Sequence, residues 1–216
     1  MSAFAVLTTS YFPSIDYFRV LSRHVETRIE CWEHFQKQTI RNRCYILSAN
    51  GILPLVVPVV HKSRSAIPVK DLQVSYRQPW QHRHWNALLA AYNRSPFFEH
   101  YADELKGAIF SDQKFLVDLN DAILEILLRF SAIQTSISRT DAYNASYGEN
   151  DFRWVSEKAG RKPTASKEDE NTYLQVFTAK FDFVAGMSVV DLLFNTGPEA
   201  AAYLENTKLI SRKKRV

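Results

Sequence analysis

Cysteine, glycine and long apolar runs are all scarce in this 216-residue chain, and each scarcity excludes a class of protein. Only two cysteines are present, and without an export signal we expect them to stay reduced in a cytoplasm. The six glycines form neither a Walker A loop nor a G-x-G-x-x-G motif, so no phosphate-cradling loop is predicted. The longest apolar run, residues 52–60, contains two prolines and is too short to span a membrane.

The positive charge of the chain is concentrated at its end. The formal net charge is +4, and residues 212–215 (Arg-Lys-Lys-Arg) alone supply that excess. The remainder is formally neutral and cannot create the field on which non-specific nucleic-acid binding depends. We therefore predict no nucleic-acid partner and interpret residues 211–216 as a solvated basic tail.

Length and composition predict one α/β or α+β domain over residues 1–210. Apolar periodicity favours helices after Ser14, around Trp85, after Pro96 and over Leu116 to Phe130. Residues 158–172 are almost free of apolar side chains, which is typical of a mobile surface loop. Two capping-box patterns, at Ser188 and Thr196, predict two closing helices. The helices are expected to cover a mixed sheet, with strands at residues 3–8, 27–31, 43–60, 70–75 and 174–177.

Residues 43–60 are predicted to form a β-hairpin around the dipeptide Asn50-Gly51. In a tight Asn-Gly turn, Pro54 and Pro58 would occupy positions whose amides should bond to the partner strand, and proline has no amide hydrogen. A longer loop or a bulge would turn both prolines outward, and we expect that arrangement. Residues 53–60 would then be an edge strand.

A cluster of polar side chains precedes the first strand of this hairpin. Lys37, Arg41 and Arg43 are candidates for anion recognition, because two guanidinium groups on one face of an extended segment can grip a carboxylate or phosphate. The alternative is a surface cluster paired with Glu30, Glu33 or Asp71.

Asn42 and Cys44 alternate onto the face opposite to the two arginines. If that face points to the core, Cys44 is a small buried hydrophobe and Asn42 bonds to backbone groups. The competing interpretation is a thiolate nucleophile activated by a histidine, with His34, His61, His82 or His84 available. Nothing in the spacing selects a catalytic triad.

His84 is the best candidate for acid–base chemistry. It lies near the predicted start of the Trp85 helix, on the shoulder of the apolar stripe, where a cleft residue could sit. The alternative is a half-buried histidine that holds a carbonyl. His82 and His84 are not completed by further ligands at metal-site spacing, so no metal and no cofactor are predicted. The spacing of Ser188 and Asp191 is explained by helix capping.

Several blocks, in this order along the chain, resemble the WbqC-like protein family of bacteria. The resemblance spans about residues 8–204, and two family features are replaced: Thr9-Ser10 stands where Gln-Pro is typical, and Cys31-Trp32-Glu33 where an acidic pair is typical. The blocks that carry it are Tyr11-Phe12-Pro13 with Tyr17-Phe18, Lys37 to Arg43, Leu55 to Val59, Trp80 to Trp85, Tyr92 with Ser95 to Phe98, Tyr173 with Gln175 and Phe177, and Ser188 to Leu193.

The resemblance implies a cytoplasmic protein of bacterial surface-polysaccharide (O-antigen type) biosynthesis. The ligand would be an anionic sugar nucleotide or an acyl-type molecule, and the reaction a group transfer, such as acyl or aminoacyl transfer to an amino sugar. A non-catalytic binding or scaffold protein is the alternative, and the sequence does not determine the oligomeric state. In the enzyme hypothesis His84 is the acid or base. The ligand contacts are Lys37, Arg41, Asn42, Arg43, Tyr11, Trp80, Tyr173 and Gln175.

Overall fold

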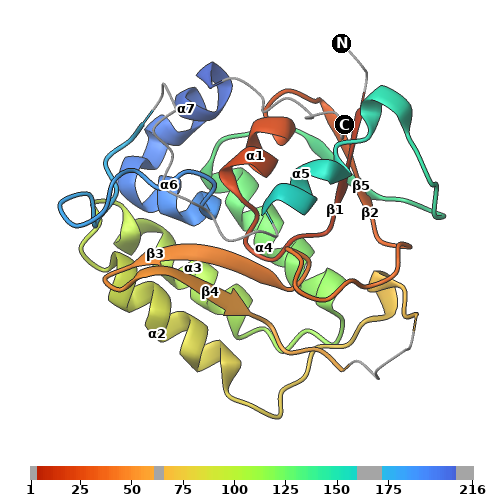
Figure 1. Cartoon of the computed structure of the whole chain (residues 1–216), viewed down its shortest axis with the longest axis horizontal. Helices are drawn as coiled ribbons and strands as arrows, with labels where there is room; N and C mark the ends of the chain where they lie inside the picture. The colour runs from red at the N-terminus through yellow and green to blue at the C-terminus, as the bar shows by residue number, and fades with distance from the viewer. Residues whose placement is uncertain (1–3, 61–65, 160–171, 208–216) are drawn as a thin grey trace.

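The strands form two small sheets, one parallel and one antiparallel (Figure 1). A computed structural model describes residues 4–60, 66–159 and 172–207. The parallel sheet has the order β1-β2-β5, and the hairpin β3-β4 is the antiparallel sheet. The predicted α/β fold class is confirmed, with the two kinds of pairing in separate sheets. The strands are β1 (Phe4–Thr8), β2 (Glu26–Glu30), β3 (Arg43–Ser48), β4 (Gly51–Val56) and β5 (Ser136–Arg139).

The helices surround both sheets. In Figure 1 the hairpin lies against α2, while α1 and α5 lie beside the parallel sheet. No helix in the described ranges is both long and apolar enough to cross a membrane. The helices are α1 (Ile15–Leu21), α2 (Trp80–Tyr92), α3 (Phe98–Ile109), α4 (Leu116–Phe130), α5 (Arg153–Ala159), α6 (Val189–Thr196) and α7 (Ala200–Asn206). Short 3-10 helices occupy Val69–Asp71, Gly148–Asn150 and Gly197–Glu199.

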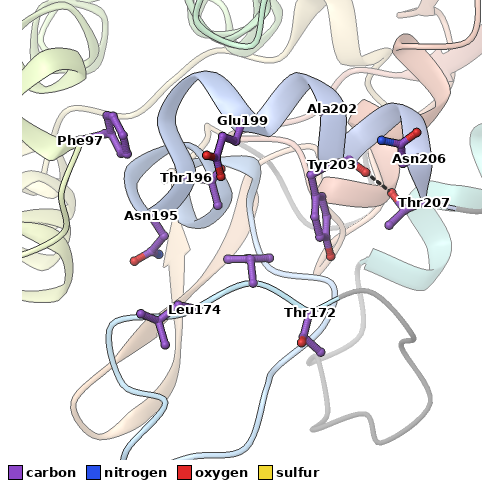
Figure 2. A pocket seen from close by; sticks show the side chains of 11 residues that line it. Phe97, Thr172, Leu174, Asn195, Thr196, Glu199, Ala202, Tyr203, Asn206 and Thr207 are labelled. Atoms are coloured by element: carbon purple, nitrogen blue, oxygen red, sulfur yellow. Dashed lines mark hydrogen bonds between the residues drawn. The ribbon is translucent and has the colours of Figure 1, made fainter.

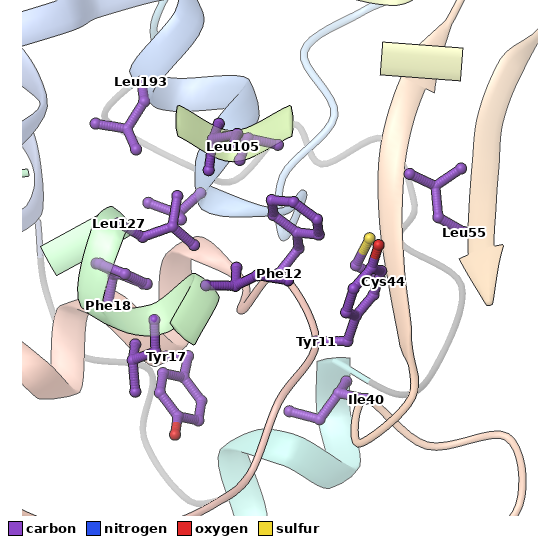
Figure 3. Close-up of a cluster of buried hydrophobic side chains, with 14 of the residues drawn as sticks. Tyr11, Phe12, Tyr17, Phe18, Ile40, Cys44, Leu55, Leu105, Leu127 and Leu193 are labelled. Atoms are coloured by element: carbon purple, nitrogen blue, oxygen red, sulfur yellow. The ribbon is translucent and has the colours of Figure 1, made fainter. Parts of the chain in front are cut away.

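The core forms around the segment that follows β1. Tyr11 and Phe12 are buried there, and Figure 3 shows them among side chains from helices far apart in the sequence. Phe18 comes from α1, Leu127 from α4 and Leu193 from α6, and all three are fully or almost fully buried. The apolar stripe predicted for residues 116–130 therefore faces this centre, as helical periodicity requires.

The hairpin turn is tight and lies one residue earlier than predicted. Ser48 pairs with Gly51, which leaves a two-residue turn. The Val57 amide donates to the Asn42 carbonyl at 2.8 Å, so the odd-numbered amides of β4 point to β3 and Pro54 points away. The expected longer loop or bulge is wrong, because a shift of the turn by one residue is enough to place the proline outward.

Two predicted strands are not formed. Residues 69–71 are a 3-10 helix whose first amides bond to the loop after β2, and residues 73 and 74 make only isolated bridges. Residues 172–175 have no regular structure and residues 176–180 form a turn, with the Thr178 amide donating to the Gln175 carbonyl at 3.1 Å. In the first segment bonds to loops distant in sequence replace a ladder, and in the second a local turn does.

The predictions for the C-terminal part of the chain are tested only in part. Ser188 caps α6 by accepting the Val190 amide, as predicted. Thr196 caps nothing, because its hydroxyl donates back to the Leu192 carbonyl at 2.9 Å. Of the predicted loop at 158–172, residues 158–159 belong to α5 and 160–171 lie outside the described residues, as does the tail at 211–216.

Candidate functional site

Polar side chains gather where the parallel strands end. The carboxyl ends of β1, β2 and β5 meet at one edge, and in open α/β sheets ligands bind in the crevice outside that edge. Thr8 ends β1 and Glu30 ends β2, and both are fully buried. Thr140, directly after β5, is buried as well. Buried polar groups at this edge make it the first place to look for a site.

Glu30 connects the carboxyl edge of the sheet to the chain that follows β5. Its carboxylate accepts hydrogen bonds from the Trp32 amide at 2.8 Å, the Thr140 hydroxyl at 3.2 Å and the Tyr147 hydroxyl at 3.1 Å. Arg153 lies 3.8 Å from the same carboxylate. Burial, followed by the charge of Glu30, raises the pKa of Tyr147 to about 12. Glu30 is therefore a satisfied anchor that joins β2 to the chain around residues 140–153.

Glu33 and Arg41 form an ion pair in front of this anchor. The Arg41 Nε and Nη2 atoms lie 2.9 and 2.7 Å from Glu33 Oε1, and the Thr8 hydroxyl donates to the same oxygen. Both side chains are mostly buried, at 8% and 14% exposure. This is the pairing that the sequence left as the alternative for Arg41, although it lies in a cavity and not on an open surface.

Asp151 and Arg153 form a second pair on the other side of β1. Arg153 donates from Nε at 2.9 Å and from Nη2 at 2.6 Å to the two oxygens of Asp151, a bidentate bond. Asp151 makes a parallel bridge to Val6, which fixes the pair beside β1. Burial raises the pKa of Asp151, but the bonds from Arg153 outweigh it, so the pKa lies below its usual range.

The two pairs line one cavity of ≈ 280 Å³, which we call the carboxyl-edge pocket. Two carboxylates and two guanidinium groups balance each other in its wall. Ser156 is 3% exposed, and its hydroxyl has no hydrogen-bond partner among the described residues. Such a buried orphan group calls for a partner that the protein does not supply. The lining residues are Glu33, Gln36, Thr39, Arg41, Tyr143, Ala145, Asp151, Arg153, Trp154 and Ser156.

The structure separates the predicted anion-binding residues. Arg41 lines the carboxyl-edge pocket, whereas Arg43 lines a different, much smaller recess. Strand β3 begins only at Arg43, so the alternation rule that placed both arginines on one face does not reach Arg41. Lys37 is exposed on the loop between two pocket-lining residues. Asn42 donates to the Val57 carbonyl at 2.8 Å and so bonds to backbone.

His84 lies in the core. Helix α2 begins at Trp80, two residues before the predicted start at His82, so His84 lies inside the helix and is 5% exposed. Its Nδ1 is 2.8 Å from the Tyr11 hydroxyl, and the edge of the Trp80 ring packs against it. Burial lowers the pKa of His84 to about 4, opposed by a hydrogen bond with the backbone of Val56. His84 does not line the carboxyl-edge pocket.

Tyr173 and Gln175 meet at the buried carboxylate of Asp191. Asp191 accepts hydrogen bonds from the hydroxyls of Tyr92, at 2.7 Å, and Tyr173, and from Gln175 Nε2 at 2.8 Å. Burial raises the pKa of Asp191, and the three donors oppose that rise. The capping interpretation of Asp191 is wrong for its side chain, because the carboxylate points away from the helix start and fastens residues 173–175 to α2 and α6.

Tyr173 also borders an open groove of ≈ 710 Å³ (Figure 2). One wall is the segment of Thr172 and Leu174, and the other is formed by α6, α7 and the turn between them. No buried charged side chain faces this groove from the described lining residues. The groove is therefore hollow enough for a ligand, but its described lining has few groups that could hold a polar ligand in one orientation.

Cys44 is a core residue, as the alternation argument predicted. It is 4% exposed, and burial raises the pKa of its thiol far above the usual range. Figure 3 shows the sulfur beside Tyr11 and within the apolar cluster. A thiolate nucleophile is disfavoured at such a position.

Sequence reasoning selected Arg41, named Glu30 and Glu33 only as possible ion-pair partners, and missed Asp151, Arg153 and Ser156. Glu30 carried a usable signal, since a charged residue at the carboxyl end of a predicted strand marks the functional edge of a parallel sheet. Asp151, Arg153 and Ser156 carried none, because they lie more than 100 residues from the strands they join. In the described residues no cluster of three or more His, Cys, Asp or Glu side chains is arranged to hold a metal ion.

The fold and the site define an α/β protein with a polar cavity at the carboxyl edge of a parallel sheet. A sequence model of the WbqC-like protein family matches residues 9–159, and the chain belongs to this family. The match includes every residue that lines the carboxyl-edge pocket and ends before Tyr173.

One curated relative is similar over nearly its whole length. The chain is 24% identical over 227 residues to the uncharacterized protein Rv1507c of Mycobacterium tuberculosis, covering 94% of this chain and 98% of that protein. No solved structure matches the chain.

Proposed function

We propose that this protein binds the sugar part of a small-molecule substrate in the carboxyl-edge pocket, and that it acts in the cytoplasm in bacterial surface-polysaccharide biosynthesis. The observation that carries the proposal is the pocket wall of two carboxylate–guanidinium pairs beside the unpartnered Ser156 hydroxyl. The polysaccharide context rests on the resemblance to the WbqC-like family. The ligand remains to be identified by experiment.

The chemistry of the wall matches a polyhydroxylated ring. Sugar hydroxyls both donate and accept hydrogen bonds, and each ion pair presents an acceptor and a donor side by side. Tyr143 and Trp154 add aromatic surface. The cavity of ≈ 280 Å³ lies at the lower limit of ligand pockets, about 300 Å³, which suits one sugar ring and not a whole sugar nucleotide. A phosphate or other anionic group would then lie outside, where Lys37 is the exposed cation on the adjacent loop.

The reaction proposed is a group transfer to the bound sugar, such as acyl or aminoacyl transfer to an amino sugar. The buried His84 is remote from solvent, so Glu33 and Asp151 are the groups of the pocket that could accept a proton from the sugar amine. The second candidate is a non-catalytic binding protein. It is favoured by the pairing of both carboxylates with arginine, because each guanidinium competes for the electron pair that a general base needs.

Binding is tested with the purified full chain by thermal shift and calorimetry, using UDP-N-acetylglucosamine and a dTDP-linked amino sugar as probes. A ligand of the native state raises the unfolding midpoint with its concentration. Ser156→Ala removes an orphan hydroxyl, so stability should be unchanged or slightly higher. The affinity of the sugar should fall about 3- to 10-fold, which corresponds to one hydrogen bond.

The matched control is Arg139→Gln, because Arg139 is 41% exposed and paired with Asp118 on the surface. It should leave sugar binding intact. The proposal fails if neither probe gives a saturable shift, or if Ser156→Ala binds a probe as tightly as the parent chain. Mass spectrometry of chain, acyl donor and amino sugar separates the two candidates, since only an enzyme yields the acylated sugar.

A further inference from the structure

Arg43 is half-buried and differs from three other arginines, which are paired with carboxylates. Arg19, Arg41 and Arg153 each have a carboxylate oxygen within 2.8 Å. Arg43 has no ion pair among the described residues, and its contact to an oxygen is a long one, from Nη1 to the Tyr45 hydroxyl at 3.5 Å. Its Nε is buried without any acceptor. A buried cationic donor of this kind is costly unless an acceptor outside the chain completes it.

The side chain of Arg43 lines a recess of ≈ 10 Å³, which we call the Arg43 recess. This volume is about that of one water-sized particle, so a single atom fits and a phosphate or carboxylate group does not. The recess is separate from the carboxyl-edge pocket and shares no lining residue with it. It is lined by Ser10, Phe12, Ser14, Ile40, Arg43, Cys44, Tyr45, Gly186 and Ser188.

Two serine hydroxyls in the recess act as hydrogen-bond acceptors and can also donate. Ser14 accepts the Tyr17 amide at 3.3 Å and Ser188 accepts the Val190 amide at 3.5 Å, as the caps of α1 and α6. Neither hydroxyl donates to any acceptor in the described part of the chain. With Arg43, they bring three side chains that can donate a hydrogen bond to the lining of one atom-sized recess. A water there would bring two more hydrogens, whereas an anion brings only acceptor capacity.

We propose that the Arg43 recess binds a single halide-sized anion, chloride under ordinary conditions. The anion accepts hydrogen bonds from Arg43 Nε and from the hydroxyls of Ser14 and Ser188, and it neutralises the guanidinium. These groups come from the start of β3, the start of α1 and the start of α6. Ser14 and Ser188 already form an antiparallel bridge, so the anion completes a junction of three segments distant in sequence.

The test measures the unfolding midpoint of the full chain in sodium gluconate with increasing sodium chloride or bromide at constant ionic strength. The midpoint should rise with halide concentration and then follow its logarithm, as linkage to a single site requires. Arg43→Gln should abolish this dependence. Arg28→Gln is the control, since Arg28 is 42% exposed and paired with Glu26, and it should keep the dependence unchanged.

A crystal grown in bromide gives a direct readout through its anomalous signal. We expect a peak within about 3.5 Å of Arg43 Nε, a hydrogen-bonding distance for a halide. Ser188→Ala should shift the halide dependence to higher concentration even if loss of the cap lowers the midpoint itself. The proposal is overturned if the recess holds only water in bromide, if Arg43→Gln retains the halide effect, or if phosphate stabilises the chain through Arg43 and halides do not.

Discussion

His84 is the histidine that sequence reasoning favoured for proton transfer, and its ring is held in the core by Tyr11 and by the backbone of Val56. A neutral imidazole can keep both contacts, since one ring nitrogen accepts and the other donates. A second proton would place a positive charge on a ring that is buried from solvent, which is unfavourable. The physical consequence of burial is therefore a dependence of stability on pH.

Stability should fall as the pH is lowered from 6.5 toward 4. The pKa of His84 is about 4 in the folded chain against 6.5 for a free histidine, so the unfolded chain binds the extra proton in this window. The full effect is about 3 kcal/mol, from about 1.4 kcal/mol per pKa unit. Urea unfolding at pH 7, 6, 5 and 4.5 measures it.

The variant His84→Gln removes this titration and should flatten the pH dependence between 6.5 and 4.5, although the variant is less stable at pH 7. His82→Gln is the matched control, because His82 is an exposed neighbour on the same helix. Its pH profile should follow the parent. An identical slope in His84→Gln and the parent would show that other groups cause the acid sensitivity.

At the scale of elements, the carboxylate of Asp191 joins three pieces of the molecule. Tyr92 belongs to α2, Asp191 to α6, and Tyr173 and Gln175 to a segment without regular structure. Gln175 also bonds through its side chain to the Val184 amide at 2.9 Å. A segment that lacks a ladder of its own is thus held by side-chain bonds to one charged group.

Tyr173→Phe should destabilise the chain by about 1.5–3 kcal/mol at pH 7, the usual range for a hydrogen bond to a charged group. Burial already raises the pKa of Asp191, and the hydrogen bond from Tyr173 opposes that rise. Removal of this donor should therefore raise the pKa further and destabilise the ionised carboxylate. A raised carboxyl pKa costs stability as the pH rises through it, so the loss should be smaller at pH 4. Urea titrations at the two pH values test this.

Limited proteolysis gives a second readout of the same change. Cleavage between residues 173 and 184 should accelerate in Tyr173→Phe, because the segment then has one hydrogen bond fewer to oppose local opening. Tyr143→Phe is the control, since Tyr143 is 58% exposed. Equal cleavage rates in the two variants would contradict the fastening function of Asp191.

Two glycines should respond oppositely to alanine. Gly197 has φ +55, and a Cβ there would lie 2.4 Å from the Phe97 ring, so Gly197→Ala should cost at least about 1 kcal/mol from backbone strain alone. Gly107 lies in α3 with no atom within 4 Å of an added Cβ. Gly107→Ala should stabilise by about 0.5–1 kcal/mol. Thermal unfolding of both variants checks the signs, and a Gly197→Ala variant as stable as the parent would contradict the predicted backbone strain.

At the scale of the whole molecule, the sequence predicted those elements whose cause is local. The stripe from Leu116 to Phe130, the Ser14 cap and the apolar first strand were all found, since periodicity and capping chemistry act within a few residues. Residues 70–75 were misassigned because bonds to the loop after β2 decide their conformation. That loop is distant in sequence, so no local pattern reports it.

The candidate site was predictable only in part for the same reason. Arg41 was predicted as a ligand contact from the cluster of cations around it. Its partner Glu33 was one of the residues named as a possible ion-pair partner. The other half of the pocket, from Tyr143 to Ser156, reaches the sheet through the bridge between Val6 and Asp151. The anion-binding interpretation of Arg43 stays a prediction, now directed to a recess of its own.

The parallel sheet also governs the order in which the molecule can be made. Strand β2 pairs with β1 on one side and on the other with β5, where Glu26 faces Ser136 across 136 − 26 = 110 residues of chain. During synthesis β1 and β2 leave the ribosome long before β5, so one edge of β2 stays open while the intervening chain is translated. Loop closure over that distance favours slow folding, because the entropy of closing the loop is lost before the contacts of β5 with β2 form. The carboxyl-edge pocket and the Arg43 recess therefore form late, because each needs residues from the second half of the chain.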